Sequence, residues 1–238
     1  MRMQKSVSLA ALLLAGLLAA CGPSAPEPAA QPTLQVQTEP APASTIQTEA
    51  GGPVIVFLGD SLTAGFGLGP EYALPEQIGM RLVQAGVEAK IINAGVSGDT
   101  TAGGLARYDW SVASANPDLV FVALGANDYL GGGSPEQARG NLRAILARLQ
   151  ADGVQAVIAS VEARASGIDD PRAEAFSQIY PELAAEFGVP HFIGLLSKVR
   201  GRADLLLQDG LHPTAEGVGL MADDVAAFLV PIVADLPD

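Results

Sequence analysis

Three residues near the two ends of one apolar domain have the types needed for nucleophilic catalysis. Ser61 lies in the run FLGDSLTAGFGLG, and Asp209 precedes His212 by three residues in QDGLHPTAEG. A serine hydroxyl is a poor nucleophile until a neighbouring base takes its proton, and an imidazole serves best as that base when a carboxylate fixes its tautomer. The sequence therefore offers Ser61 as a nucleophile, His212 as its base and Asp209 as the group that orients His212.

Each end of this set has a simpler interpretation when it is taken alone. The glycine-bearing turn at residues 59–62 could cradle a phosphate or serve only as a tight turn, although it lacks the Gly-Lys-Ser/Thr of a Walker-type loop. Asp209 and His212 could instead cap a helix that starts near Thr214. From the residues alone, these alternatives stay open.

Short apolar runs predict the strands that must position these residues. The runs are continuous rather than alternating, as parallel strands covered on both faces are. Ser61 follows the first strand, which puts its hydroxyl on a loop at the carboxyl edge of the sheet, where α/β proteins bind ligands. The predicted strands are 54–58, 89–93, 119–124, 156–161 and a weaker one at 191–193.

Helical patterns alternate with these strands. The clearest begins at Ser134, which can cap the helix, with Pro135 in the first turn and Gln137 three residues after the cap. Alternation of strand and helix implies a parallel sheet with helices on both faces and right-handed crossovers, in a single domain over residues 53–238. The other predicted helices are 75–85, 171–187 and 214–229.

The order Ser, Asp, His along the chain is that of α/β-hydrolases, but the chain contains no G-x-S-x-G nucleophile elbow. Four ordered motif blocks point to another family. They are GDSL from Gly59, NAGVSGDT from Asn93, GAND from Gly125 and DGLHP from Asp209. On these blocks the chain resembles the SGNH or GDSL hydrolase family. The runs GLARYDW and FSQIYPELAAEF are similar to the family's bacterial multifunctional thioesterase, arylesterase and lysophospholipase branch.

The resemblance implies both a fold and a mechanism. The fold would be a flavodoxin-like, three-layer α/β/α sandwich around a five-stranded parallel sheet. Ser61 would attack the acyl carbon of an ester, His212 would take and return the proton, and Asp209 would orient His212. The oxyanion would be held by the backbone N–H groups of Ser61 and Gly98 and by the side-chain amide of Asn127. No metal ion and no organic cofactor is expected.

Other polar residues near these motifs are expected to have structural roles. Asp60 and Asp128 should hydrogen-bond neighbouring groups, and His191 should pack at the start of its strand. The third block departs from the family's usual Gly-Gly-Asn-Asp because Ala126 replaces the second glycine. This is a small change, and we expect Asn127 to keep its place.

The N-terminal segment predicts export and a lipid anchor. Arg2 and Lys5 are followed by an apolar run too short for a membrane span, so residues 1–20 are expected to be a signal peptide. The run ends in LAAC, which resembles the lipobox of bacterial lipoproteins and makes Cys21 the expected lipidation site; an ordinary secretory signal is the alternative. Residues 21–52 are rich in Pro, Ala, Gln and Thr and predict a disordered tether.

Charge, cysteine content and the predicted export limit the classes of partner that the protein can bind and the compartment in which it lies. The 13 Lys and Arg against 26 Asp and Glu give a formal net charge of −13, which opposes binding to nucleic acid or to an anionic lipid surface. Cys21 is the single cysteine, which excludes an intrachain disulfide. The domain would lie in the cell envelope, outside the cytoplasm, facing the periplasm or at the outer membrane of a Gram-negative cell. Attachment to the membrane would come from the lipid on Cys21.

The expected substrate is a small-molecule or lipid ester, such as an aryl ester, a lysophospholipid or a thioester. An acyltransferase or a carbohydrate O-acetyl esterase of the cell envelope is the alternative. The region 162–171 is divergent, and in related enzymes a loop there borders the substrate pocket. The sequence therefore leaves the acyl-chain length open, and it does not define the oligomeric state.

Overall fold

The sheet predicted from the apolar runs is present. In the computed structural model residues 45–46, 52–160 and 171–236 are described, all within one unit, Pro40–Asp238. Among these residues six strands form one sheet in the order β1-β3-β2-β4-β5-β6. Their bounds are β1 (Thr45–Ile46), β2 (Val54–Gly59), β3 (Lys90–Gly95), β4 (Leu119–Ala123), β5 (Gln155–Ala159) and β6 (His191–Phe192).

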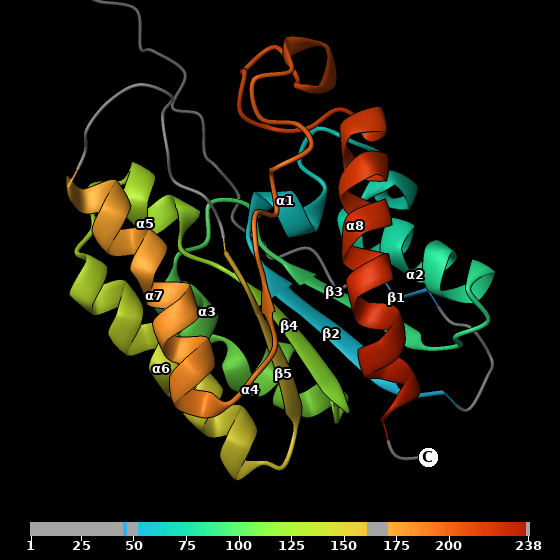
Figure 1. The fold of residues 1–238 in the computed structure, drawn as a ribbon, viewed down its shortest axis with the longest axis horizontal. Helices are drawn as coiled ribbons and strands as arrows, with labels where there is room; N and C mark the ends of the chain where they lie inside the picture. The colour runs from blue at the N-terminus through green and yellow to red at the C-terminus, as the bar shows by residue number, and fades with distance from the viewer. Residues whose placement is uncertain (1–44, 47–51, 161–170, 237–238) are drawn as a thin grey trace, which may run out of the picture. The chain divides into compact units, whose positions relative to one another are not determined.

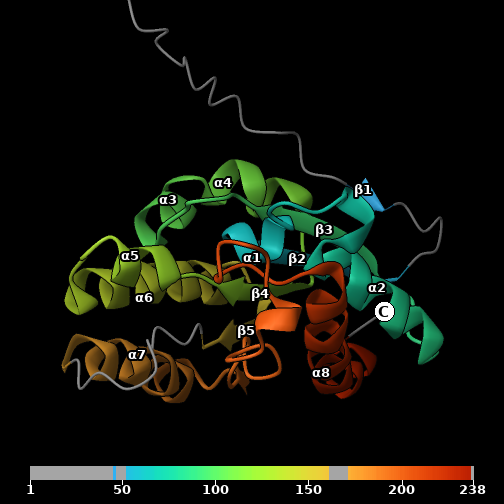
Figure 2. The same cartoon turned by 90° about the horizontal axis from the view of Figure 1, so that it is seen from above.

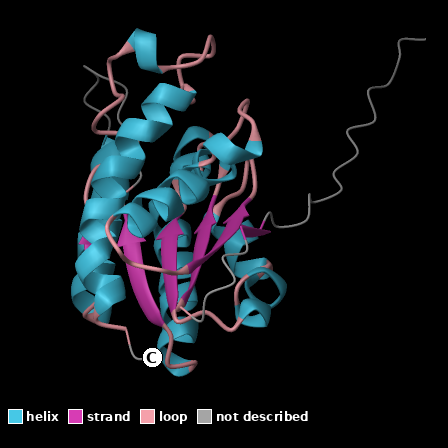
Figure 3. Ribbon diagram, turned by 90° about the vertical axis from the view of Figure 1, so that its right-hand side faces the viewer, coloured by secondary structure: helices cyan, strands magenta, loops and turns pink. Residues whose placement is uncertain are grey.

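Strands β2 to β6 run parallel, and Figure 3 shows them pointing toward one end of the molecule. Their order is that of flavodoxin-like sheets, so the predicted five-stranded parallel sheet is confirmed. The two-residue strand β1 lies within the segment 21–52 and pairs antiparallel with β3 at the edge of the sheet. Every residue of β4 is buried, as expected for a strand covered on both faces.

Helices cover both faces of the sheet and complete the three predicted layers (Figures 1 and 2). On one face lie α2 (Leu74–Gln84) and α8 (Ala215–Ala234). On the other face lie α3 (Thr101–Ala106), α4 (Tyr108–Ser111), α6 (Pro135–Ala151) and α7 (Pro171–Phe187). Shorter elements are α1 (Ser61–Ala64), α5 (Ala126–Leu130), η1 (Pro70–Tyr72), η2 (Ala113–Ala115) and η3 (Ala203–Leu205).

The predicted start of α6 is confirmed by its cap. The hydroxyl of Ser134 accepts hydrogen bonds from the backbone N–H groups of Glu136 and Gln137 at the start of α6. Helix α8 extends beyond the predicted end at residue 229, because Val233 still packs into the core. By length and composition α8 is the one helix among the described residues that could cross a membrane, yet its apolar face is packed against the sheet.

The carboxyl ends of the three central strands meet at one edge of the sheet. Gly59 of β2 is paired with Gly95 of β3 and with Ala123 of β4, so the loops that follow these strands start at the same level. A Cβ on Gly95 would lie 2.3 Å from the backbone nitrogen of Ala64, so only glycine lets α1 sit this close to β3. The segments that follow β2, β3 and β4 carry Ser61 at the start of α1, Gly98 in a loop and Asn127 in α5.

Candidate active site

The turn from β2 into α1 exposes Ser61 at the sheet edge. Asp60 is the N-cap of α1, and its Oδ1 accepts a hydrogen bond of 3.0 Å from the backbone N–H of Leu62. Ser61 is the first residue of the short helix, and its side chain leaves the strand direction toward the loop that precedes α8. The local structure therefore presents the serine hydroxyl to residues from the far end of the chain.

Ser61, His212 and Asp209 form one chain of hydrogen bonds. His212 Nε2 lies 2.9 Å from Ser61 Oγ, and His212 Nδ1 lies 2.7 Å from Asp209 Oδ2. Because a carboxylate only accepts, it selects the tautomer with a proton on Nδ1 and leaves Nε2 as an acceptor for the serine hydroxyl. The arrangement is that of a nucleophile, a base and an orienting carboxylate.

Asp209 is held in its ionised form by the loop that carries it. Its Oδ1 accepts hydrogen bonds from the backbone N–H groups of His212 and Leu211. These bonds, together with the one to the His212 ring, lower the pKa of the Asp209 carboxyl to about 2. Thr214, whose hydroxyl accepts from Gly217 N–H, caps α8. The alternative in which Asp209 and His212 cap this helix is therefore wrong.

A third side chain, which was not predicted from the sequence, contacts the imidazole. The ring of Phe66 lies against that of His212, with centroids 4.2 Å apart and planes inclined by 31°. Phe66 is 47 % exposed, so its other face is open to solvent. The contact covers one side of the imidazole and restricts its rotation away from Ser61. The only signal in the sequence was an aromatic residue five positions after the serine.

The backbone N–H groups predicted to hold an oxyanion are free to bind one. Among the described residues neither the N–H of Ser61 nor that of Gly98 has a hydrogen-bond acceptor. Gly98 has a φ of +81°, a conformation that favours glycine, and a Cβ there would meet nothing within 4 Å. Ser61 starts α1 and Gly98 lies on the loop after β3, so both N–H groups are at the carboxyl edge of the sheet.

Asn127 keeps the predicted place despite Ala126 in front of it. Its Nδ2 donates to the backbone carbonyl of Asp99 at 2.8 Å and makes a long contact of 3.5 Å to Asp60 Oδ2. The amide carries two protons. The short bond anchors one of them, and the second proton, which has only the long contact, is the one available to a ligand oxygen.

Asp60 has the structural role predicted for it, but the raised pKa of its carboxyl was not predicted. The residue is 1 % exposed. Burial raises the pKa of its carboxyl from 3.8 to about 6, and the hydrogen bond from Leu62 N–H and the charge of His212 only partly oppose this. The cause is tertiary, because Asp60 is buried beside Asn127, which is 67 residues away in the sequence.

We expect the raised pKa of Asp60 to reduce the stability of the fold as the pH rises. The folded state binds the proton more tightly than the unfolded state, so this stabilisation is complete below pH 4 and is lost as the pH passes through 6. The full loss is about 3 kcal/mol. Urea unfolding of the wild type and of Asp60→Asn between pH 4 and 7.5 measures it. The difference between the two unfolding free energies should change over this range, and a constant difference would contradict the assignment.

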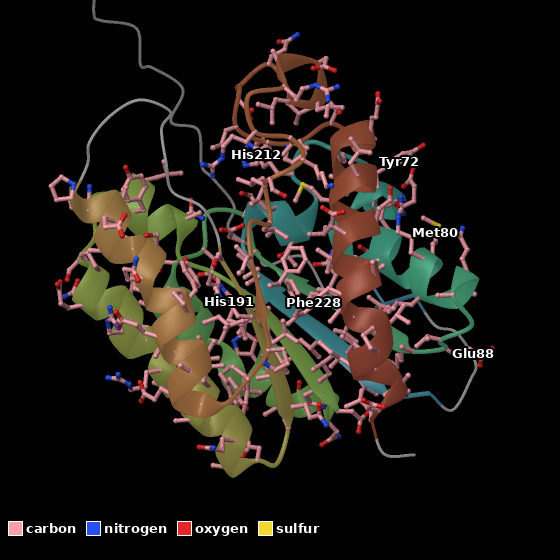
Figure 4. The ribbon with its side chains drawn as sticks, in the orientation of Figure 1. Tyr72, Met80, Glu88, His191, His212 and Phe228 are labelled. Carbon is pink, nitrogen blue, oxygen red and sulfur yellow. The ribbon has the colours of Figure 1, made fainter. Side chains whose placement is uncertain are left out.

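Two further polar residues have the structural surroundings predicted for them. Asp128 accepts hydrogen bonds from the backbone N–H and the hydroxyl of Thr101, which ties α5 to α3. His191 contacts the hydroxyl of Ser160, and burial lowers the pKa of its ring. His191 is the first residue of β6, and Figure 4 shows it lower in the view than His212.

Several of the predictions concern residues whose structure is not described. Residues 1–20, Cys21 and nearly all of the divergent region 162–171 lie outside the described residues. Within the described part of the chain there is no group of three or more His, Cys, Asp or Glu side chains that could hold a metal ion.

Comparison with known proteins identifies the family. The model of the GDSL-like lipase/acylhydrolase family matches residues 57–220, which include Ser61, Gly98, Asn127, Asp209 and His212. The chain belongs to this family. It has the SGNH hydrolase fold and is a carboxylic ester hydrolase.

Individual relatives place the chain within the family. It is 33 % identical over 184 residues to thioesterase 1/protease 1/lysophospholipase L1 of Escherichia coli (strain K12), covering 77 % of this chain and 86 % of that protein. It is 33 % identical over 176 residues to the arylesterase of Vibrio mimicus, covering 74 % and 88 %. A crystal structure of TesA matches with a TM-score of 0.70 and 30 % identity, covering 75 % of this chain and 99 % of that one. The predicted branch of the family is confirmed.

Proposed function

We propose that this enzyme hydrolyses carboxylic esters through an acyl-enzyme on Ser61. The observation that carries the proposal is the continuous chain of hydrogen bonds from Ser61 Oγ through the His212 ring to Asp209. An imidazole whose unprotonated Nε2 lies 2.9 Å from the serine hydroxyl is in position to take its proton. A carboxylate with a pKa of about 2 stays charged beside the imidazolium that results.

The reaction has two stages. In the first, Ser61 Oγ bonds to the acyl carbon while His212 takes the hydroxyl proton, and the carbonyl oxygen becomes an anion. The N–H groups of Ser61 and Gly98 and the amide of Asn127 stabilise that charge. The intermediate then collapses, and His212 returns the proton to the departing alcohol. In the second stage a water molecule repeats the sequence on the acyl-enzyme, which releases the carboxylic acid and restores Ser61.

The substrates we propose are aryl esters, lysophospholipids and other acyl esters, including thioesters. The names of the relatives support this range, because they include an arylesterase and a thioesterase that is also a lysophospholipase. The predicted export argues against intracellular acyl-CoA as the natural substrate. A lipid or small-molecule ester of the cell envelope is the substrate class that fits both considerations.

A panel of p-nitrophenyl esters from acetyl to palmitoyl, with lysophospholipid alongside, tests this proposal. Wild-type protein should hydrolyse members of the panel, and Ser61→Ala should not. Activity confined to acetyl esters would favour a carbohydrate O-acetyl esterase instead. Transfer of the acyl group to an added acceptor alcohol in preference to water would favour an acyltransferase. Absence of turnover on every ester would contradict the proposal.

We also propose that Cys21 anchors the mature enzyme in the cell envelope through a lipid. The support is the apolar signal-like run that ends in LAAC, followed by a segment without hydrophobic periodicity. With one or two further acyl chains, such an anchor holds a protein stably on a membrane. The acidic domain would not bind an anionic surface by charge alone.

Replacement of the lipidated cysteine should release the enzyme from membranes. In cells that express the full chain, Cys21→Ser should shift the protein from the membrane fraction to the soluble fraction or leave its signal peptide uncleaved. Fractionation and the mass of the mature N-terminus measure this, with Ser24→Ala as a control just beyond the same site. Unchanged processing and unchanged membrane partition of Cys21→Ser would refute the anchor.

A further inference from the structure

A buried arginine outside the predicted site contacts two of the loops that form it. Arg107, in the turn between α3 and α4, is 5 % exposed. Its Nε donates to Asp99 Oδ2 at 2.7 Å, and its Nη2 donates to the backbone carbonyl of Gly59 at 2.9 Å. Its Nη1 donates to the hydroxyl of Ser111. One guanidinium thus connects three separate segments beneath the sheet edge.

The two loops it connects carry the proposed oxyanion donors. Gly59 lies two residues before Ser61, and Asp99 directly follows Gly98. Asp99 also accepts the short hydrogen bond from Asn127 through its backbone carbonyl. The side chain of Arg107 and the residue Asp99 therefore join all three donors in one network of hydrogen bonds.

We propose that Arg107 is a positioning residue that sets the distance between the oxyanion donors of Ser61, Gly98 and Asn127. This inference rests on the proposed acyl-enzyme function. Among the described residues the guanidinium of Arg107 bonds Asp99, Ser111 and the Gly59 carbonyl rather than the triad, and it takes no proton in the mechanism, so it acts only through the loops that it holds. An oxyanion hole stabilises charge because its donors are fixed before the reaction, and a displacement near 1 Å costs about 100-fold in rate.

The surroundings of Asp99 allow little freedom in this link. The side chain of Asp99 is 10 % exposed, and its Oδ1 accepts from the backbone N–H of Thr100 at 3.0 Å. A Cβ on Gly103 would lie 1.8 Å from that oxygen, so helix α3 packs directly against the carboxylate. The ion pair between Arg107 and Asp99 is buried, and both side chains also hydrogen-bond backbone groups. It therefore differs from a solvent-exposed ion pair, which contributes little to stability.

Only arginine can make these contacts together. Its planar fork presents several N–H donors in fixed directions, whereas lysine offers one compact charge. Arg107→Lys would keep the positive charge beside Asp99 but could not also reach the carbonyl of Gly59 and the hydroxyl of Ser111. The loop after β2 and the loop after β3 would then be free to shift relative to each other.

The test compares kcat and KM of wild type, Arg107→Met and Arg107→Lys on p-nitrophenyl butyrate. We expect Arg107→Met to lower kcat about 10- to 100-fold with KM changed less than about 3-fold, and Arg107→Lys to fall between. Arg143→Met is the matched control, because Arg143 forms a bidentate but exposed pair with Glu186. Leu146→Ala, a core change in α6, controls for loss of stability alone. Both controls should keep kcat.

Two readouts separate positioning from a purely structural role. Affinity for phenylboronic acid, which forms a tetrahedral adduct with a catalytic serine, should fall by the same factor as kcat in Arg107→Met. The double variant Arg107→Met/Asn127→Ala should lose less than the product of the two single effects, because both act on one oxyanion site. In the double variant Leu146→Ala/Asn127→Ala the loss of activity should instead equal the product of the two single losses.

The outcomes distinguish this inference from the proposed function. If wild-type protein hydrolyses esters and folded Arg107→Lys keeps the kcat and boronate affinity of the wild type, the positioning role is wrong. It is also wrong if Arg107→Met loses activity only in proportion to its unfolded fraction. If the wild type neither hydrolyses esters nor binds the boronic acid, the failure lies in the proposed function itself.

Discussion

Ser61→Ala should lower kcat for ester hydrolysis by about 10⁴- to 10⁶-fold, and His212→Ala should lower it nearly as much. Without the hydroxyl no acyl-enzyme can form, and without the imidazole the serine loses the one base that the described residues place within hydrogen-bond reach of it. The double variant should be little slower than either single one, because the two residues perform one step. Asp209→Ala should be equal or milder, since Asp209 orients the ring without handling the transferred proton.

Steady-state kinetics and active-site titration with p-nitrophenyl butyrate measure these changes in kcat. Ser61→Ala should keep the unfolding midpoint of the wild type, because a small side chain is exchanged at a loop edge and leaves no large cavity. His191→Ala is the matched control for His212→Ala, since His191, on β6, hydrogen-bonds Ser160 after β5, and this change should leave kcat within a few-fold. Independent, multiplicative effects of Ser61→Ala and His212→Ala would contradict a shared step.

The second large effect concerns the oxyanion. Asn127→Ala should lower kcat by about 10²- to 10³-fold and change KM little, because the amide is needed chiefly when the carbonyl oxygen becomes negative. The same change also removes the bond to the Asp99 carbonyl, so its effect on stability has to be measured by urea unfolding.

Asn127→Asp separates the donor from the size of the side chain. Aspartate has nearly the same shape but offers only acceptors when ionised, and it would stand beside Asp60. It should therefore be at least as slow as Asn127→Ala. A variant of either kind with the kcat of the wild type would remove Asn127 from the oxyanion site.

The sequence predicted the parts of the fold that local chemistry determines. Strands β2 and β4 are continuous apolar runs, and α6 begins with a serine cap followed by proline, so their places needed no tertiary information. The residues brought together at the sheet edge were also predictable. Parallel strands end at a common edge, and the polar residues of the motif blocks follow strand ends or lie on the loop before the last helix.

What the sequence did not predict depends on contacts between distant segments. Arg107 lies in the run GLARYDW, which resembles the family branch, but nothing in that run indicates its hydrogen bond to Gly59, 48 residues away. The raised pKa of Asp60 arises from its burial in the folded chain, and the contact of Phe66 with His212 joins opposite ends of the domain. Strand β1 has only two residues, too few for a periodic pattern. None of these features has a local signature.

Labelling with a fluorophosphonate tests the central claim most directly. The reagent traps an activated serine: the Ser61 oxygen would bond to phosphorus and fluoride would leave. Peptide mass spectrometry should find the adduct on Ser61 in the wild type, little adduct in His212→Ala and none in Ser61→Ala. The rate of ester hydrolysis should fall in proportion to the fraction of Ser61 that is labelled. Protein that hydrolyses esters at its full rate while Ser61 carries no label, or a fully active Ser61→Ala, would contradict the proposed mechanism.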